Sequence, residues 1–286
     1  MLLIAGTMPI ENLPLTIGKV SLEGDFLVVN NQRMPRTQGT GAMINAALTV
    51  TNFLKIESPH ALVVGDIGDG KGSREMYQYL IDNIAEICPK VLTLHYCLPI
   101  MGLTKKLCQS VAKCAKRPIM IADAGAMYAA VAVGLSREFD IFTPDPSEMS
   151  YLADPNASHP AYIRRHLFGV DATQTPQLVA SAYQNNRAPR YLMVKGRIDY
   201  IVRDGNVVAT ITEPCIPQLE PIGGTGDTIT GLVSGLVYGG FEPDKAAIIA
   251  AKTNRLAGQL AKPTPATKVK EIIDYFPQVF EQTIKS

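Results

Sequence analysis

The sequence has no run of apolar residues long enough to span a lipid bilayer, so it offers no candidate membrane anchor. Residues 1–6 are apolar, but this stretch is short, has no basic leader and soon reaches Pro9, Glu11 and Pro14. A secretory signal needs a basic start and a longer apolar segment. We therefore interpret residues 1–6 as a strand and expect no membrane partner.

Blocks of basic residues and paired cysteine motifs are also missing. The net charge is +1, charges of both signs are mixed along the chain, and the densest basic cluster spans only residues 164–166. This pattern argues against a nucleic-acid partner, and we interpret the cluster as exposed surface. The five cysteines form no C-x-x-C pair, and their odd number indicates reduced thiols in a cytoplasmic protein.

Length and composition indicate a globular enzyme-sized chain. Hydrophobic residues make up 47% of the sequence, which is enough to bury a large core and makes disorder unexpected. A length of 286 residues fits one large α/β domain or two small ones. Because the chain has no internal repeat, low-complexity tract or clear linker, we predict a single domain over residues 1–286.

Short apolar runs alternate with helical patterns along the chain. Predicted strands cover residues 61–64, 91–94, 118–122, 139–142 and 190–194, and predicted helices cover residues 73–87, 103–116, 125–135, 226–238, 243–260 and 268–284. This alternation predicts right-handed βαβ units and a parallel sheet with helices on both faces. Residues 15–35 predict a small β element, and residues 198–211 predict a hairpin.

The strongest functional signal is the segment Gly223-Gly224-Thr225-Gly226-Asp227-Thr228, which leads directly into an apolar helix. The glycines allow several backbone N–H groups to converge, and the positive end of the helix adds to them, so the segment predicts an anion site. A carboxylate repels phosphate, but it can accept a proton from a hydroxyl that attacks phosphate. Asp227 is therefore a candidate general base; the alternative is that it only caps the helix.

The helix after this segment carries glycines on one face. Gly231, Gly235 and Gly239 recur at every fourth residue. Residues four apart lie on the same side of a helix, so this spacing predicts close packing against a neighbouring helix.

A second glycine-rich segment, residues 65–73, lies between a predicted strand and a predicted helix. It has the spacing of a P-loop, but Gly72 stands where that motif needs serine or threonine for magnesium. Acidic residues at 66 and 69 would also repel a phosphate. We interpret the segment as a turn that lines a substrate cleft, and the cleft residues are Gly68, Asp69 and Gly70.

Polar residues follow three predicted strands, and ligands gather at the carboxyl ends of parallel strands. Asp123 is expected to point into the cleft. Lys195 is placed to reach a phosphate or, alternatively, is an exposed lysine at a strand end. Asp145 and Glu148 are spaced to face a hydrated magnesium ion or to cap the helix that begins near Ser147, and the sequence leaves both readings open. His95 is too isolated in the sequence to indicate a metal site.

In this order, the motifs resemble those of the ribokinase-like superfamily. The chain looks most like the carbohydrate-kinase-like branch that contains ATP- or ADP-dependent NAD(P)H-hydrate dehydratases. Residues 143–148, 195–196 and 224–227 match the T-P-H-x-x-E, K-G and G-T-G-D elements of that branch, and residues 123–127 are similar to its D-A-D-A-L element. The resemblance implies an α/β fold: a ribokinase-like three-layer α/β/α sandwich with a mostly parallel central sheet.

The resemblance covers roughly residues 60–285 and has departures. Asp145 replaces the usual histidine, Gly125 replaces the second aspartate of D-A-D, and Pro221-Ile222 stand where the dehydratases usually carry Ala-Thr. Residues 1–60 match poorly and are a candidate lid or substrate-side element, with residues 61–286 as the nucleotide-binding core. These departures leave the substrate open.

The resemblance also implies a function and assigns roles to residues. It implies an enzyme that uses ATP or ADP with Mg²⁺ on a small-molecule substrate, with Asp227 as the base. The residues that it places at the phosphates are Gly223, Gly224, Thr225, Gly226 and Lys195. Asn254 is assigned to the nucleotide, and Asp145 and Glu148 to the metal.

NAD(P)H-hydrate dehydration is the first functional hypothesis. The alternative is a kinase that phosphorylates a hydroxyl of a sugar, vitamin precursor or similar small molecule. A non-enzymatic nucleotide sensor is a third reading, and the retained Asp227 argues against it. The sequence does not decide whether the chain forms a homo-oligomer.

Overall fold

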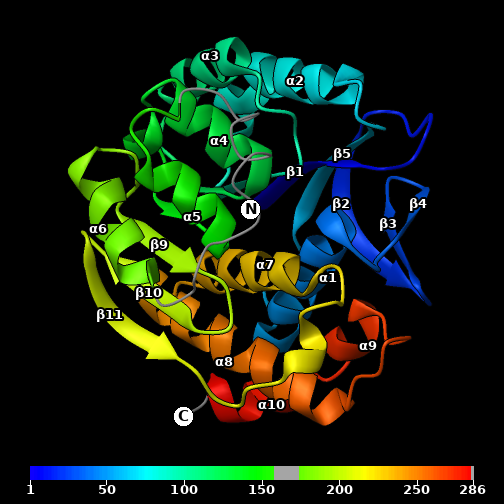
Figure 1. Cartoon of the computed structure of the whole chain (residues 1–286). Helices are drawn as coiled ribbons and strands as arrows, with labels where there is room; N and C mark the ends of the chain where they lie inside the picture. Colours follow the sequence, from blue (N-terminus) through cyan, green and yellow to red (C-terminus); the bar gives the residue numbers. More distant parts are fainter. Residues whose placement is uncertain (158–173, 285–286) are drawn as a thin grey trace.

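The computed structural model describes residues 1–157 and 174–284, which contain one sheet with helices packed against both faces (Figure 1). The basic cluster at 164–166 lies outside the described residues. The strands are β1 (Leu2–Met8), β2 (Thr16–Glu23), β3 (Phe26–Val29), β4 (Gln32–Pro35), β5 (His60–Gly65), β6 (Val91–His95), β7 (Ile119–Ala122), β8 (Ile141–Phe142), β9 (Tyr191–Val194), β10 (Asp199–Arg203) and β11 (Asn206–Ile211).

The helices follow the predicted alternation with these strands. They are α1 (Gly39–Leu54), α2 (Lys71–Ile87), α3 (Met101–Val111), α4 (Ala124–Ala132), α5 (Pro146–Ala153), α6 (Thr175–Gln184), α7 (Thr225–Tyr238), α8 (Pro243–Ala261), α9 (Val269–Ile273) and α10 (Phe276–Thr283). Two short 3₁₀ turns cover Ser136–Glu138 and Pro217–Leu219. The prediction of one helix over residues 268–284 is wrong, because two helices separated by a turn at residues 274–275 occupy that range.

The strand order is β11-β10-β9-β8-β7-β6-β1-β5-β2-β3-β4. The six central strands from β9 to β5 pair in parallel. Antiparallel pairing occurs at both ends, where β10 and β11 form the predicted hairpin and β2 to β4 form the predicted small β element. The central parallel sheet is therefore confirmed.

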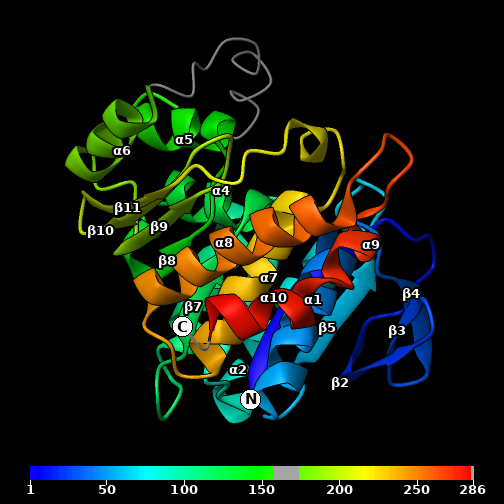
Figure 2. The same cartoon turned by 90° about the horizontal axis from the view of Figure 1, so that it is seen from below.

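Alternate residues of β1 face two separate hydrophobic cores. Leu2 and Ile4 pack with residues of α1, α7, α8 and α10, whereas Leu3 and Ala5 pack with residues of α2 to α6. This is the two-residue period of a strand buried on both faces. The three-layer arrangement is confirmed, with helices on both sides of the sheet in Figures 1 and 2.

Residues 1–60 do not form one peripheral unit. Strand β1 lies between β5 and β6 at the centre of the sheet, and α1 packs in the core against α7. Only β2 to β4, over Thr16–Pro35, extend from the β5 edge as an antiparallel flap (Figure 2). A lid or substrate-side role for residues 1–60 stays a prediction, and the flap is the part of this segment that lies at the edge of the sheet.

The glycines of α7 allow this helix to approach α1 closely. A Cβ atom added at Gly231 would lie 2.2 Å from the Met43 carbonyl oxygen, and one at Gly235 would lie 2.8 Å from the Val50 Cβ. The predicted close helix packing is thus confirmed. It also places the N-terminal ends of α1 and α7 side by side, which brings Gly39 to Asp227.

All five cysteines are unpaired thiols. Across residues 1–157 and 174–284, no helix combines the length and the apolar character that a membrane crossing requires.

Candidate active site

Four polar side chains stand at the carboxyl ends of adjacent central strands. His95 is the last residue of β6, Asp123 follows β7, Thr143 follows β8 and Lys195 follows β9. Parallel strands end at one edge of the sheet, and the N-terminus of α7 carries Asp227 to the same edge. The structure therefore brings together several predicted site residues and adds His95, which sequence reasoning set aside.

Lys195 and Asp123 form a buried ion pair. The Lys195 Nζ lies 2.8 and 3.0 Å from the two carboxylate oxygens of Asp123, and Thr230 donates a hydrogen bond of 2.7 Å to the same carboxylate. Burial alone would lower the pKa of Lys195, but the nearby charges of Asp123 and Glu148 raise it, so the ammonium stays protonated. The reading of Lys195 as an exposed strand-end lysine is wrong.

The predicted anion loop leads into α7 through Gly224, which has a φ of +102° that favours glycine. Among the described residues, the N–H groups of Gly226 and Asp227 have no protein acceptor, whereas the Thr225 N–H lies 3.4 Å from the Ile222 carbonyl oxygen. The Lys195 ammonium also lies beside the loop, 3.8 Å from where a Cβ at Gly226 would stand. The loop thus combines N–H groups that lack an acceptor, the positive end of a helix and an ammonium group. Together these features would bind a phosphate.

Asn254 supports this loop from inside the protein. Its side chain is buried, donates to the Thr225 carbonyl oxygen at 3.2 Å and accepts from the Thr228 hydroxyl at 2.8 Å. These contacts hold the first turn of α7. A direct contact between Asn254 and a nucleotide stays a prediction.

Asp227 is held by two protein donors. Its Oδ1 lies 3.0 Å from the Nε2 of His95, and its Oδ2 accepts the Gly39 N–H at 2.9 Å. Burial would raise the pKa of Asp227, but the hydrogen bond and charge of His95 and the charge of Lys195 hold it below its ordinary value. The carboxylate is therefore ionised at neutral pH, which a general base requires.

His95 itself is fully buried at the end of an apolar strand. The signal that could have identified it is its position, because it ends β6 just as Asp123 and Lys195 follow β7 and β9. Applied to every parallel strand, the strand-end rule includes this histidine.

His95, Asp123 and Asp227 also satisfy the distances of a metal site, since one ligand atom from each lies within 4.8 Å of the others. However, Lys195 and Thr230 donate to Asp123, and His95 is paired with Asp227. Protein donors already balance these carboxylates. We interpret the three residues as part of a hydrogen-bonded cluster.

Asp145 and Glu148 form a capping box at the start of α5. Each side chain accepts the backbone N–H of the other residue, at 2.7 and 2.8 Å, and Tyr128 donates to Glu148 at 3.1 Å. The capping role is therefore confirmed, and the magnesium role stays a prediction. Burial, together with the charges of Asp123 and Asp145, raises the pKa of Glu148 to about 8. Magnesium prefers hard oxygen ligands, and carboxylates supply them, so this group of acidic side chains suits a nearby magnesium ion.

The glycine-rich turn before α2 does not offer a phosphate cradle. The Asp66 carboxylate accepts the N–H groups of Gly68, Gly70 and Ser73 at 2.8 to 3.0 Å. These are the groups that a P-loop would present to a ligand. Gly70 of this turn packs beside Leu98 of the loop after β6, and the role of Gly68, Asp69 and Gly70 in a substrate cleft stays a prediction.

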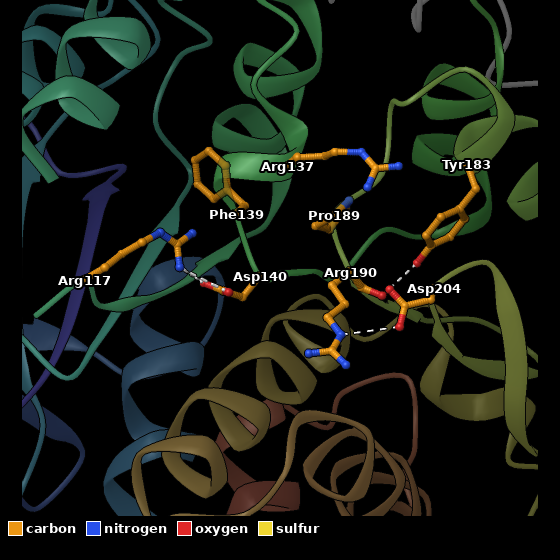
Figure 3. Close-up of a pocket in the computed structure, with 8 residues that line it drawn as sticks. All are labelled: Arg117, Arg137, Phe139, Asp140, Tyr183, Pro189, Arg190 and Asp204. Carbon is orange, nitrogen blue, oxygen red and sulfur yellow. Dashed lines mark hydrogen bonds and ion pairs between the residues drawn. The ribbon is translucent and has the colours of Figure 1, made fainter. Parts of the chain in front are cut away.

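A cavity of about 510 Å³ lies at the opposite edge of the sheet, near the starts of β8 and β9 (Figure 3). Three arginines point toward it, but Arg117 pairs with Asp140, Arg190 pairs with Asp204, and Arg137 donates to Asn186. Because each arginine already has a protein partner, this cavity is a poor anion site. The edge that carries Asp227 is the better candidate.

Comparison with known proteins identifies the family. A family model described as NAD(P)H-hydrate dehydratase matches residues 98–278. An uncharacterized protein of Methanocaldococcus jannaschii is 37% identical over 243 residues, which cover 85% of this chain and 100% of the relative. The bifunctional NAD(P)H-hydrate repair enzyme of Hyperthermus butylicus is 32% identical over 122 residues, which cover 42% of this chain and 22% of that protein.

Solved structures share the fold. The ADP/ATP-dependent NAD(P)H-hydrate dehydratase of Bacillus subtilis, co-crystallized with ATP and Mg²⁺, has a TM-score of 0.58 and 14% identity, over 98% of this chain and 89% of that one. The pyridoxal kinase of Staphylococcus aureus has a TM-score of 0.54 and 12% identity, over 88% and 86% of the two chains. The chain therefore belongs to the NAD(P)H-hydrate dehydratase family and has a ribokinase-like fold.

Proposed function

We propose that this protein is an ATP- or ADP-dependent NAD(P)H-hydrate dehydratase. The observation that carries the proposal is the Asp227 carboxylate in the first turn of α7, held by His95 and Gly39 beside N–H groups of that turn that have no acceptor among the described residues. This arrangement pairs a base with an anion site, as phosphoryl transfer to a hydroxyl requires. Membership of the family supports the hydrated nicotinamide ring as the molecule that bears this hydroxyl.

The proposed reaction has two stages. The hydroxyl oxygen of the hydrated ring attacks the terminal phosphorus of the nucleotide, its proton passes to Asp227, and the shortened nucleotide leaves. The lone pair of the ring nitrogen then expels the phosphate, and loss of a proton from the adjacent carbon restores the reduced ring. The N–H groups of Gly226 and Asp227 stabilise charge on the transferred phosphoryl group.

Magnesium, when bound, would shield the nucleotide phosphates, and Asp145 and Glu148 would face its water shell. Lys195 contributes a fixed positive charge beside the same loop while it neutralises Asp123. The five unpaired thiols support placing the reaction in the reducing cytoplasm.

A small-molecule kinase is the second candidate, because the first stage alone is a kinase reaction. The antiparallel flap of β2 to β4 favours it, since this region departs from the dehydratase pattern and provides a strand element beside the sheet. A kinase would release the phosphate ester instead of eliminating phosphate.

Two parallel assays distinguish these functions. The first supplies hydrated NADH with ATP or ADP and follows the recovered absorbance of the reduced nicotinamide. The second supplies a panel of small alcohols and follows nucleotide consumption. Recovery of NADH supports the dehydratase, consumption with an alcohol alone supports the kinase, and inactivity in both assays contradicts the proposed function.

Gly226→Val is expected to abolish the stabilisation of the protein by nucleotide. The valine branches would extend toward Lys195 and cover the N–H groups of the first turn. At ~100 times the dissociation constant, nucleotide should stabilise the wild type by about 2.7 kcal/mol. Thermal unfolding with and without ATP measures this effect.

Lys71→Ala is the matched control for the competing glycine-rich turn. Lys71 stands at the P-loop position of that turn, where Asp66 already occupies the N–H groups. The variant should keep most of the nucleotide-induced shift. If Lys71→Ala lost the shift and Gly226→Val kept it, the nucleotide would bind at the turn before α2.

Glu148→Gln is expected to raise the magnesium concentration that gives half-maximal activity. Glutamine keeps an oxygen that can accept the Asp145 N–H, so the helix cap survives, but unlike the carboxyl group it cannot ionise when magnesium binds. A magnesium titration of the initial rate measures the change. Glu138→Gln, on an exposed 3₁₀ turn, is the control, and an unchanged titration for Glu148→Gln would leave this residue with the capping role alone.

A further inference from the structure

A chain of hydrogen bonds runs from Asp227 through His95 and Thr40 to the backbone of β1. The Thr40 hydroxyl lies 2.7 Å from the carbonyl oxygen of Thr7 and 3.1 Å from the Nδ1 of His95. A carbonyl oxygen only accepts, so the Thr40 hydrogen points to Thr7. The Thr40 oxygen must then accept from His95, which places a proton on Nδ1.

The other ring nitrogen faces a carboxylate. His95 Nε2 lies 3.0 Å from Asp227 Oδ1 and 3.8 Å from Asp123 Oδ2. Without a proton between them, the lone pairs of Nε2 and Oδ1 would face each other at hydrogen-bond distance and repel. Because Nδ1 already carries one proton, a second proton belongs to the contact between Nε2 and Asp227.

The balance of charge supports the presence of this second proton. Asp123 and Asp227 contribute two negative charges, and Lys195 contributes one positive charge. The second proton makes this cluster neutral, and without it one buried carboxylate charge would stay uncompensated, which is costly. The proton resides on the ring, because imidazole is more basic than a carboxylate and because the Gly39 N–H and the Lys195 charge stabilise the ionised Asp227. Two other titratable groups interact with this cluster. They are Tyr96, whose ring packs edge-on against His95, and Glu148.

We propose that His95 is a positioning residue for the base: a buried imidazolium, protonated on both nitrogens, that holds Oδ1 of Asp227. Oδ2 is then the oxygen that takes the substrate proton, because among the described residues it accepts only the Gly39 N–H, at 2.9 Å, and keeps a lone pair. This inference rests on the proposed function for the reaction that it serves. In that step the substrate O–H bond breaks, an H–Oδ2 bond forms, and the substrate oxygen bonds to phosphorus.

Nitrogen NMR of the ring tests the protonation directly and needs no turnover. In the nucleotide-free protein at pH 7, both ring nitrogens of His95 should show the shifts of protonated nitrogen, with His95→Gln used to assign the signals. Asp227→Asn should remove the proton from Nε2, because the asparagine no longer balances the imidazolium. An unprotonated Nε2 in the wild type would overturn the proposal, even if dehydration is observed.

Kinetics test the positioning role. His95→Ala should lower kcat by about 10- to 100-fold with little change in KM, the scale of a lost hydrogen bond to a charged group. His95→Gln can still donate to Oδ1, so it should recover part of kcat, but its acid limb should move to higher pH because the positive charge beside Asp227 is gone. Thermal unfolding confirms that the variants fold.

His95→Ala with wild-type kcat and an unchanged pH profile would refute the positioning role. The proposed function can fail separately: if no substrate turns over, the kinetic arm has nothing to measure, and the NMR result alone decides whether His95 is the imidazolium partner of Asp227.

Discussion

Asp227→Asn is expected to lower kcat by ~10²–10⁴-fold, the usual cost of removing a general base. Asparagine keeps the shape of the side chain and can still accept the Gly39 N–H, but it cannot take the substrate proton. Nucleotide affinity should stay the same or rise slightly, because a negative charge that faces phosphate is removed. Initial rates on hydrated NADH and a separate nucleotide titration measure the two effects.

Asp82→Asn is the matched control, since Asp82 is exposed in the second half of α2 and accepts from the side chain of Gln78. It should retain nearly full activity. If Asp227→Asn turned over as fast as the wild type, on either the hydrate or an alcohol, phosphoryl transfer with Asp227 as base would be excluded.

The arrangement of the fold was largely predictable because its signals are local and repeated. Apolar strands buried on both faces read as short continuous runs, and each is followed by a helical pattern, as in β6 and α3. The glycines at 231 and 235 predicted a close helix contact but could not name the partner. The structure identifies it as α1, which precedes α7 by well over a hundred residues.

The early part of the chain gave the weakest sequence signal. Its poor match to the family pattern suggested a lid or substrate-side element over residues 1–60, a role that stays a prediction, and the structure places β1 at the centre of the sheet and α1 in the core. A family pattern records which side chains carry chemistry, and core positions accept many apolar residues of similar volume. A weak match therefore does not imply a peripheral location.

The candidate site also contains some residues that the sequence indicated and some that it did not. Asp227 and its glycines form one contiguous segment, so the sequence displayed them together. His95 reaches Asp227 only through the parallel order of β6 and β7 and the packing of α7 over them, and it has no neighbouring signal in the sequence. Asp145 and Glu148 were visible in the sequence, but their role was not. Their three-residue spacing suits a capping box and a metal site equally well.

Arg255 is a structural centre that neither composition nor motif spacing indicated. Its buried guanidinium lies 2.7 Å from the Asp199 carboxylate and also donates to the carbonyl oxygens of Gly196, Arg197 and Thr212 at 2.9 to 3.0 Å. Asp199 in turn accepts the Gly196 N–H at 2.9 Å. One side chain of α8 thus ties together the turn that directly follows Lys195 and the segment that leads toward the anion loop.

Arg255→Met is therefore expected to lower the free energy of unfolding by about 3–5 kcal/mol, the cost of leaving a buried charge without its partner. The midpoint of urea unfolding measures the loss. Arg203→Met is the control, because Arg203 pairs with Asp244 at a half-exposed site, where such a bridge contributes at most ~1 kcal/mol. Adding Asp199→Asn to Arg255→Met should restore part of the stability, since the unpaired buried carboxylate is then neutral. A loss for Arg255→Met no larger than that for Arg203→Met would show that the turn after Lys195 is held by other contacts.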